Sequence, residues 1–417
     1  MLLTERPEPT GARKRHRRIL PGPSLATRPF EGAALLDELE GTRGALFTWA
    51  RDVALWVQTP PDQRSGLFWP DAPRVLDLQG PSARAAAALR GLWTHPESVR
   101  SAAVAEACTS ISEWAENEGG LASTAIYFAE LAASASEDDA LLALAAGRVN
   151  RRYAVYERAR HWYERGIDLA RAHADRPAQA AGYLSWGNME FQRGRHASAR
   201  RFFVRAWRTA RKFHLREEGG AARHNLMTLA LERGKFDEAQ DHALAAFGFY
   251  GRQHGRMPYF AHDVAQLWAW QRFYSAAYPV FLAAVPLITH PKERIKLLAN
   301  LGRAAAGLGE SQVFFDAWQG VTAYVPRPNE HLAEAYVNIG EGALLLGLAA
   351  QAHDVGSRAL ALARERGESS TEAQAEALLS KVRTPTAPLV PLEPPDTVKA
   401  LSRWLLQTLQ ERAAPSM

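Results

Sequence analysis

A short phrase recurs along this chain at a nearly constant interval. It consists of Asn, an apolar residue and Gly, with a second Gly seven residues after the first. It reads ANLGRAAAGLG at residues 299–309 and VNIGEGALLLG at residues 337–347. Related copies pair Gly187 with Gly194, Met227 with Gly234 and Gly147 with Ala154, and a degenerate copy centres on Ala265. The steps are 37–40 residues, and such a period is the signature of stacked supersecondary units.

Each unit is predicted to be a pair of helices. The first helix carries the phrase, and the second Gly ends it because a residue without Cβ easily takes the left-handed conformation. In the second helix, small residues recur seven positions apart, with an aromatic residue between them in most copies. The small residues are Ala159 and Gly166, Ala199 and Ala206, Ala239 and Ala246, and Ala277 and Ala284; the aromatic ones are Tyr163, Phe203 and Phe281. Small residues let two helix backbones approach, and the aromatic ring fills the remaining gap.

These phrases, with LSWGNMEFQRGRHASARRFFVRAW as the fullest example, resemble the tetratricopeptide repeat. The resemblance covers roughly residues 96–383. The period exceeds the family's usual value of about 34, which is similar to the long-period arrays of bacterial regulators and sensors. The resemblance implies an all-α fold, a right-handed superhelical solenoid of antiparallel helix pairs. It also implies a non-catalytic scaffold or adaptor that binds a peptide or protein segment in its concave groove.

The segments that flank the array differ from it in composition. Residues 1–30 are rich in Pro and Arg and are predicted to form a disordered basic tail, and residues 31–95 a helical region. Residues 384–397 form a Pro-rich linker, and an amphipathic helix is predicted over 398–417, with Asp396 or Thr397 as its N-cap. Its apolar stripe comprises Val398, Leu401, Leu405 and Leu409, with Trp404 beside it. This helix either caps the last repeat or docks in a groove of this chain or of a partner.

The concave groove is predicted to present a row of polar side chains from the first helices. The phrase places Ser185, Asn225, Asp263, Asn300 and Asn338 there, and three positions later Asn188, Thr228, Gln266, Arg303 and Glu341. The predicted groove site comprises Asn188, His224, Asn225, His262, Asp263, Trp270, Asn300, Arg303 and Asn338. The resemblance implies that the amides of Asn188, Asn225, Asn300 and Asn338 hold a peptide backbone, which they can both donate to and accept from. Alternatively, these amides join adjacent helices inside the array.

Positive charge is concentrated in one part of the array. The chain has a formal net charge of +5, whereas residues 148–216 contain sixteen Arg and one Lys against five acidic residues, a net of +12. The predicted anionic-partner face comprises Arg151, Arg152, Arg158, Arg201, Arg205, Arg208 and Lys212. It is either a solvated face with ion pairs to acidic residues elsewhere, or a surface for nucleic acid or an acidic protein. The second interpretation makes the chain a regulatory module.

Catalytic and metal-binding signatures are missing from the sequence. It contains no H-E-x-x-H, no zinc-type Cys/His spacing, no phosphate-binding G-x-x-x-x-G-K-[ST] and no G-x-S-x-G elbow. We therefore expect no enzyme activity, no cofactor and no metal, although the chain could serve as an accessory subunit of an enzyme complex. The single Cys108 is expected to be a buried structural thiol. The basic N-terminus lacks a following apolar run, and no apolar stretch is long enough to span a membrane, so we expect a cytoplasmic protein without a membrane partner.

Overall fold

The computed structural model describes residues 101–118, 121–252, 254–323, 331–384 and 390–413. Within these ranges the chain forms sixteen α-helices and no β-strand. The helices are α4 (Ser101–Glu118), α5 (Ala122–Ala135), α6 (Ala140–Arg152), α7 (Tyr156–Ala172), α8 (Arg176–Gln192), α9 (His196–Lys212), α10 (Arg216–Glu232), α11 (Phe236–Tyr250), α12 (Met257–Trp270), α13 (Tyr274–Ala284), α14 (Pro291–Leu308), α15 (Ser311–Thr322), α16 (Leu332–Leu345), α17 (Ala349–Arg366), α18 (Ser369–Arg383) and α19 (Asp396–Ala413).

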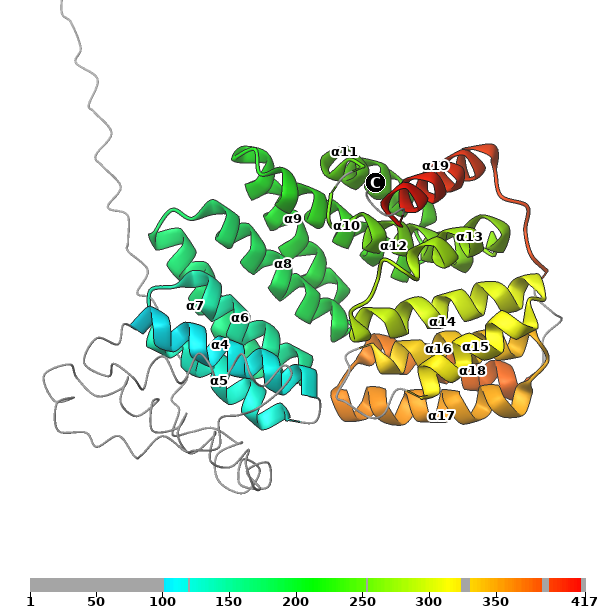
Figure 1. Cartoon of the computed structure of the whole chain (residues 1–417), viewed down its shortest axis with the longest axis horizontal. Coiled ribbons are helices and arrows are strands. Elements are labelled where there is room, and N and C mark those ends of the chain that lie inside the picture. The colour runs from blue at the N-terminus through cyan, green and yellow to red at the C-terminus, as the bar shows by residue number, and fades with distance from the viewer. Residues whose placement is uncertain (1–100, 119–120, 253, 324–330, 385–389, 414–417) are drawn as a thin grey trace, which may run out of the picture.

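Consecutive helices pack as pairs, and the pairs stack in chain order (Figure 1). The pairs run from α4 with α5 to α16 with α17, and α18 follows as a single helix. The prediction of an all-α solenoid of helix pairs is therefore confirmed. The predicted tail at 1–30 and the predicted helical region at 31–95 lie outside the described residues.

The turn between the two helices of each unit has the same backbone form in six successive units. The residue at the second position of the phrase has a positive φ in every one: Ala154, Gly194, Gly234, Arg272, Gly309 and Gly347, with values of 60–78°. The next backbone N–H donates to the carbonyl five residues earlier at 2.8–2.9 Å, as in Arg195 to Glu190 and Leu348 to Ala343. This bond satisfies a carbonyl that the helix end would leave unpaired. The predicted left-handed turn is confirmed, and it tolerates Ala and Arg as well as Gly.

From α7 to α10 the long period comes from long helices rather than long loops. The helices α7, α8, α9 and α10 each have 17 residues, and three-residue turns join them.

Asp residues cap the N-termini of two of the first helices, α6 and α8. Asp139 accepts from the backbone N–H groups of Leu141 and Leu142, and Asp175 accepts from that of Ala178. Such N-caps satisfy donors at the start of a helix.

The first Gly of the phrase allows the two helices of a unit to approach. A Cβ added at Gly187 would lie 2.4 Å from Cε1 of Phe203, and one added at Gly147 would lie 2.5 Å from Cδ1 of Tyr163. Both rings are fully buried. The aromatic residue of the second helix thus fills the space that the first helix leaves open, as the sequence pattern predicts.

The C-terminal helix packs in the middle of the array. It lies against α12 and α13, with Val398, Leu405 and Leu409 buried in the same core as those helices. The Trp404 ring meets Phe247 of α11 edge to face at a centroid distance of 4.5 Å. The predicted apolar stripe is therefore confirmed, but the helix does not cover the last repeat: its docking site is an outer face of this chain's own central repeats. It starts at Asp396, so this residue lies in the first turn rather than at the N-cap.

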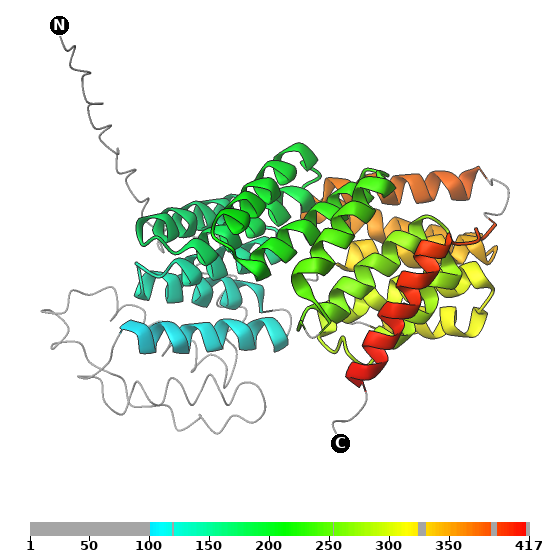
Figure 2. The same cartoon turned by 90° about the horizontal axis from the view of Figure 1, so that it is seen from above.

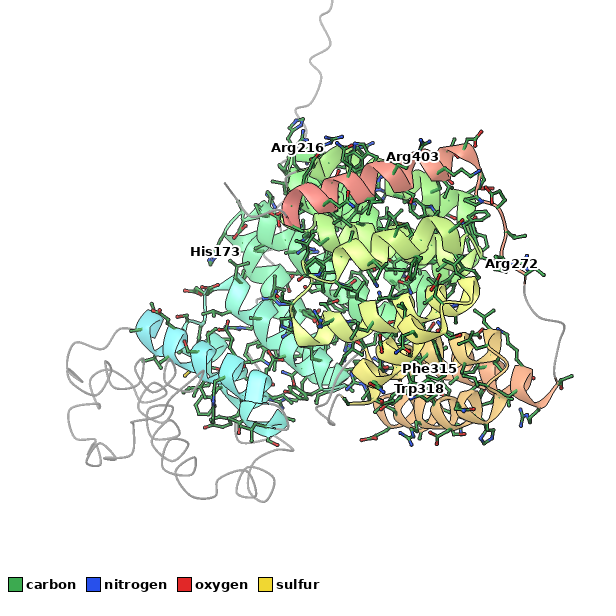
Figure 3. The ribbon with its side chains drawn as sticks, turned by 45° about the vertical axis from the view of Figure 1, so that its right-hand side comes forward. His173, Arg216, Arg272, Phe315, Trp318 and Arg403 are labelled. Atoms are coloured by element: carbon green, nitrogen blue, oxygen red, sulfur yellow. The ribbon has the colours of Figure 1, made fainter. Side chains whose placement is uncertain are left out.

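The segment that leads into α19 is joined to the array by hydrogen bonds. Arg272, at the turn between α12 and α13, donates through its guanidinium to the carbonyl of Val390 at 3.3 Å, and its own carbonyl accepts from the N–H of Leu392 at 3.0 Å. In Figure 3, Arg272 lies at the edge of the array beside this segment, and Arg403 points away from α19. Ser402 then donates to the carbonyl of Ala276 at 2.7 Å. These contacts fix the register of α19 on α13.

Two further predictions from the sequence concern Cys108 and membrane-spanning helices. Cys108 is 1% exposed in the core of α4, and burial raises the pKa of its thiol to about 12, so the predicted structural thiol is confirmed. Across the described ranges, every helix is too short or too polar to cross a lipid bilayer.

Replacement of Gly187 by Ala tests the close approach of paired helices. The added Cβ would overlap the Phe203 ring, so we expect the variant to lose about 1–3 kcal/mol of unfolding free energy in urea. Gly248→Ala is the matched control, because a Cβ at that exposed helical position meets nothing within 4 Å. This control should gain up to about 1 kcal/mol. Equal stabilities of the two variants would contradict the packing argument.

Candidate functional site

A cavity of about 290 Å³ lies where the first helices of the central repeats face α14, α16 and α18. This volume is close to the lower end of the 300–1,000 Å³ typical of ligand sites. Most of its lining is polar or charged. The lining residues are Arg151, Asn188, Phe191, Gln192, Phe203, Asn225, Thr228, Leu231, Glu232, Asp263, Gln266, Glu293, Lys296, His331, Glu334, Glu368, Ser370, Thr371 and Gln374. The size suits an amino-acid side chain or the end of a peptide.

The cavity is closed on one side by the last repeat, which turns back onto an early one. In the view from above, the helices α17 and α18 reach toward the earlier repeats, and α18 contacts α8 (Figure 2). The Tyr156 hydroxyl donates to the carbonyl of Arg366 at 2.9 Å, and the Arg366 guanidinium donates to the carbonyl of Arg152 at 3.0 Å. The same guanidinium pairs with Glu368 at 2.7 Å, and both side chains are buried. Gln192 donates to Glu368 at 2.8 Å. The last repeat therefore closes one side of the cavity.

A second set of hydrogen bonds crosses the closure between α18 and α10. Ser370 donates to Glu232 at 3.0 Å, and the Gln374 amide donates to the same carboxylate at 2.9 Å. Burial, and after it repulsion from Glu334, raises the pKa of Glu232 to about 7. The hydrogen bonds and Lys296 oppose this rise without cancelling it. A carboxyl group that titrates near neutrality therefore lies between the first and last parts of the array.

The centre of the cavity wall is an ionised carboxylate, Asp263 of α12. His224 Nε2 and His262 Nδ1 each lie 2.8 Å from one of its oxygens, and Lys296 Nζ lies 3.4 Å away. Burial by itself would raise the pKa of Asp263, but the charge of Lys296 and the two histidine hydrogen bonds hold it well below its usual range. Burial would conversely lower the pKa of Lys296, and Asp263 with Glu334 raises it. Both residues are therefore charged at neutral pH.

The predicted row of amides divides into two groups with different surroundings. Asn188 and Asn225 line the cavity, and the side-chain N–H of Asn225 donates to the side-chain oxygen Oδ1 of Asn188 at 3.1 Å. Thr228 and Gln266, three positions after Asn225 and Asp263, also line it. This part of the sequence prediction agrees with the structure.

The other two amides, Asn300 and Asn338, are almost fully buried and join helices together. The Asn300 amide lies 3.0 Å from His262 Nε2 of α12. Asn338 accepts from the Arg303 guanidinium at 3.1 Å and donates to the carbonyl of Glu334 at 3.2 Å. Neither lines the cavity; both join adjacent helices, which is the alternative that the sequence left open for these amides.

Four more predicted groove residues lie outside the cavity lining and contact neighbouring side chains. His224 and His262 are buried and orient Asp263. The Arg303 guanidinium lies over the Trp270 ring at 5.7 Å from its centroid. None of the four lines the cavity, because their helices turn these side chains toward neighbouring helices.

The cavity contains charged residues that the sequence analysis did not select. Glu232, Lys296 and Glu334 are absent from the predicted groove site. A signal was present for two of them: Lys296 lies one turn before Asn300 and Glu334 one turn before Asn338, so each shares a helix face with the repeated phrase. The contacts of Glu232 with α18 join residues about 140 positions apart, and no repeat pattern predicts them.

The arginines of the predicted anionic-partner face also divide into two groups. Those of α6 and α7 have acidic or polar partners: Arg152 pairs with Glu116 at 2.7 Å, and Arg158 pairs with the buried Glu130. Arg151 donates to Gln192 at 3.0 Å and lines the cavity. Arg152 and Arg158 thus have the ion pairs to acidic residues that one of the two interpretations expects, whereas Arg151 contacts an amide.

The basic residues of α9 have a different environment. This helix carries Arg200, Arg201, Arg205, Arg208, Arg211 and Lys212 and no acidic residue. All six are exposed. Within the part of the chain that the structure describes, none of them lies within ion-pair distance of a carboxylate. The guanidiniums of Arg211 and Arg223 lie over the half-buried Trp207 ring at 4.7 and 4.3 Å. Positive charge and aromatic surface therefore occur together here.

Stability should depend on pH through Glu232. Its pKa is about 7 in the folded chain and near 4.5 when the group is free, so the folded state holds a proton that the unfolded state releases. Between pH 4.5 and 7, stability therefore falls as pH rises, by up to roughly 3 kcal/mol. Glu232→Gln should remove this part of the slope in urea unfolding measured across that range. An unchanged slope would contradict the assignment.

Comparisons with known proteins add no residue roles to this geometry. The cavity is therefore characterised by its own atoms: a small, partly open space lined by amides and carboxylates from several helices. The sequence matches no model of a known protein family, and no curated protein is significantly similar to it.

Proposed function

We propose that this chain is a non-catalytic binding protein of the tetratricopeptide class that holds a peptide or protein segment in the cavity of its array. It acts as a cytoplasmic scaffold or adaptor, of the long-period type found in bacterial regulators. The observation that carries this proposal is the pair Asn188 and Asn225, which successive repeats present to one partly open polar space. The recurring left-handed turns and helix pairs support the class assignment.

Side-chain amides suit a peptide because they match both of its backbone groups. The Asn225 amide donates to Asn188, which leaves a donor on Asn188 and an acceptor on Asn225 for a ligand. The small volume favours a terminus or a single inserted side chain over a long extended segment. The ion pairs and hydrogen bonds around Asp263 keep this wall rigid, which lowers the entropy lost on binding.

Two matched double variants test this function. Asn188→Ala with Asn225→Ala should leave the melting temperature almost unchanged and reduce recovery of bound partners about tenfold, since each lost hydrogen bond contributes about 1 kcal/mol. The partners are identified by mass spectrometry after affinity purification with the full chain as bait. Asn300→Ala with Asn338→Ala should instead destabilise the fold by about 1–3 kcal/mol per site. Partner recovery that persists in the first variant would refute the proposal.

A second candidate function is supported by the exposed basic face of α9. We propose that this face binds a polyanion, and that the polyanion is a nucleic acid, whose phosphates the exposed guanidiniums contact. Arg205 lies 5.7 Å from the Phe202 centroid and Arg211 lies 4.7 Å from the Trp207 centroid, so these rings hold two of the six basic residues of α9 in place. Unneutralised Arg and Lys residues release counterions when they bind phosphates, which favours association at low salt.

The triple change Arg201→Gln, Arg205→Gln and Arg208→Gln tests this second function. Binding of a single-stranded oligonucleotide should weaken, and the slope of log affinity against log salt should fall by about 2. The control replaces Arg358, Arg383 and Arg403 by Gln, since these three exposed arginines lie on other helices. Absence of wild-type binding at about 50 mM salt, or equal effects of the two triple changes, would exclude a nucleic-acid role for α9.

A further inference from the structure

At one end of the cavity, α10, α12 and α16 each contribute a hydrogen-bond acceptor that can accept further hydrogen bonds. These acceptors are the carboxylates of Glu232 and Glu334 and the amide oxygen of Gln266, all of which line the cavity. Glu232 accepts hydrogen bonds from Ser370 and Gln374, which are neutral donors. Glu334 accepts a hydrogen bond from Gln266 at 3.3 Å, and its charge contributes, after burial, to the raised pKa of Glu232.

Gln266 provides a buried acceptor without a donor among the described residues at the same end of the cavity. Its side chain is only 3% exposed. Its Nε2 donates to Glu334 at 3.3 Å, whereas its Oε1 has no hydrogen-bond partner in the described part of the chain. A buried acceptor without a donor is destabilising, because it has lost its hydrogen bond to water. A ligand that donates to this oxygen would remove that destabilisation.

The charges of the lining favour a cationic donor. Five carboxylates line the cavity, those of Glu232, Asp263, Glu293, Glu334 and Glu368, against Arg151, Lys296 and the imidazole of His331. Arg366 pairs with Glu368 at 2.7 Å, and Lys296 with Asp263 at 3.4 Å. Glu334 lies 3.9 Å from both Lys296 and His331, and Glu232 has no ion pair among the described residues. Negative charge therefore exceeds positive charge at the end that Glu232 and Glu334 form.

We infer that this end of the cavity binds the primary ammonium group of a peptide ligand, through Glu232, Glu334 and Gln266. An ammonium has three N–H donors and no acceptor, so it matches three acceptors with an excess of negative charge. The group comes either from a peptide N-terminus or from a Lys side chain. This inference rests on the proposed peptide-binding function and specifies which peptides the cavity selects.

Three synthetic hexapeptide pools separate the sources of the ammonium. The first has free N-termini and no Lys, the second has acetylated N-termini and contains Lys, and the third is acetylated and lacks Lys. Binding of each pool to the full-length chain is measured by calorimetry near pH 7.5. We expect the first or the second pool to bind at least about tenfold more tightly than the third, because hydrogen bonds to charged groups are stronger than those between neutral groups. Whichever pool is preferred identifies the source.

Variants connect this preference to the three acceptors. Glu232→Gln keeps the shape of the side chain and removes its charge, so the tenfold preference should disappear. Glu365→Gln is the matched control, because Glu365 is an exposed residue of α17 outside the cavity, and this variant should retain the preference. If Glu232→Gln fails to fold, the comparison of pools on the wild-type chain still decides the question.

The outcomes distinguish this inference from the function on which it rests. If the three pools bind equally well, the ammonium site is refuted and the peptide-binding function stands. If no pool binds, the peptide-binding function is refuted together with the inference. A preference that survives Glu232→Gln would place the ammonium elsewhere and overturn the assignment of these residues.

Discussion

The left-handed turn inside each helix pair is the constraint on which the rest of the structure depends. It ends the first helix at the same position of the repeated phrase in each unit and reverses the chain there, with one hydrogen bond that spans five residues. Because this turn recurs in six successive units, the first helices present equivalent positions to the same side. The cavity wall formed by Asn188, Asn225 and Asp263 is a direct result of this regularity.

The sequence predicted the elements that repeat, because repetition is visible in one dimension. The turn positions, the Gly187 to Phe203 contact and the apolar stripe of α19 follow from residue type and spacing alone. The sequence did not predict where α19 docks, since its stripe describes a buried face without naming the surface that buries it. It also did not predict the closure by α18, which depends on the accumulated curvature of many units.

The amide row shows why the candidate site was only half predictable. All four Asn residues occupy related repeat positions, and the sequence left open whether they bind a partner or join helices. In the later repeats, Asn300 and Asn338 are buried between helices, with His262 and Arg303 as partners. Asn188 and Asn225 remain beside open space. The same local pattern thus has two roles that the global shape selects.

The closure also affects how the chain unfolds. A simple repeat array has only nearest-neighbour interfaces, so its ends can fray while its centre persists. Here the bonds from Tyr156 and Arg152 to Arg366 join positions more than 200 residues apart, and Glu232 is bonded to Ser370. Separation of the last repeat must break these bonds together with its own interface. The segment from α7 to α18 therefore behaves as one cooperative unit, and its assembly must wait for a long loop to close.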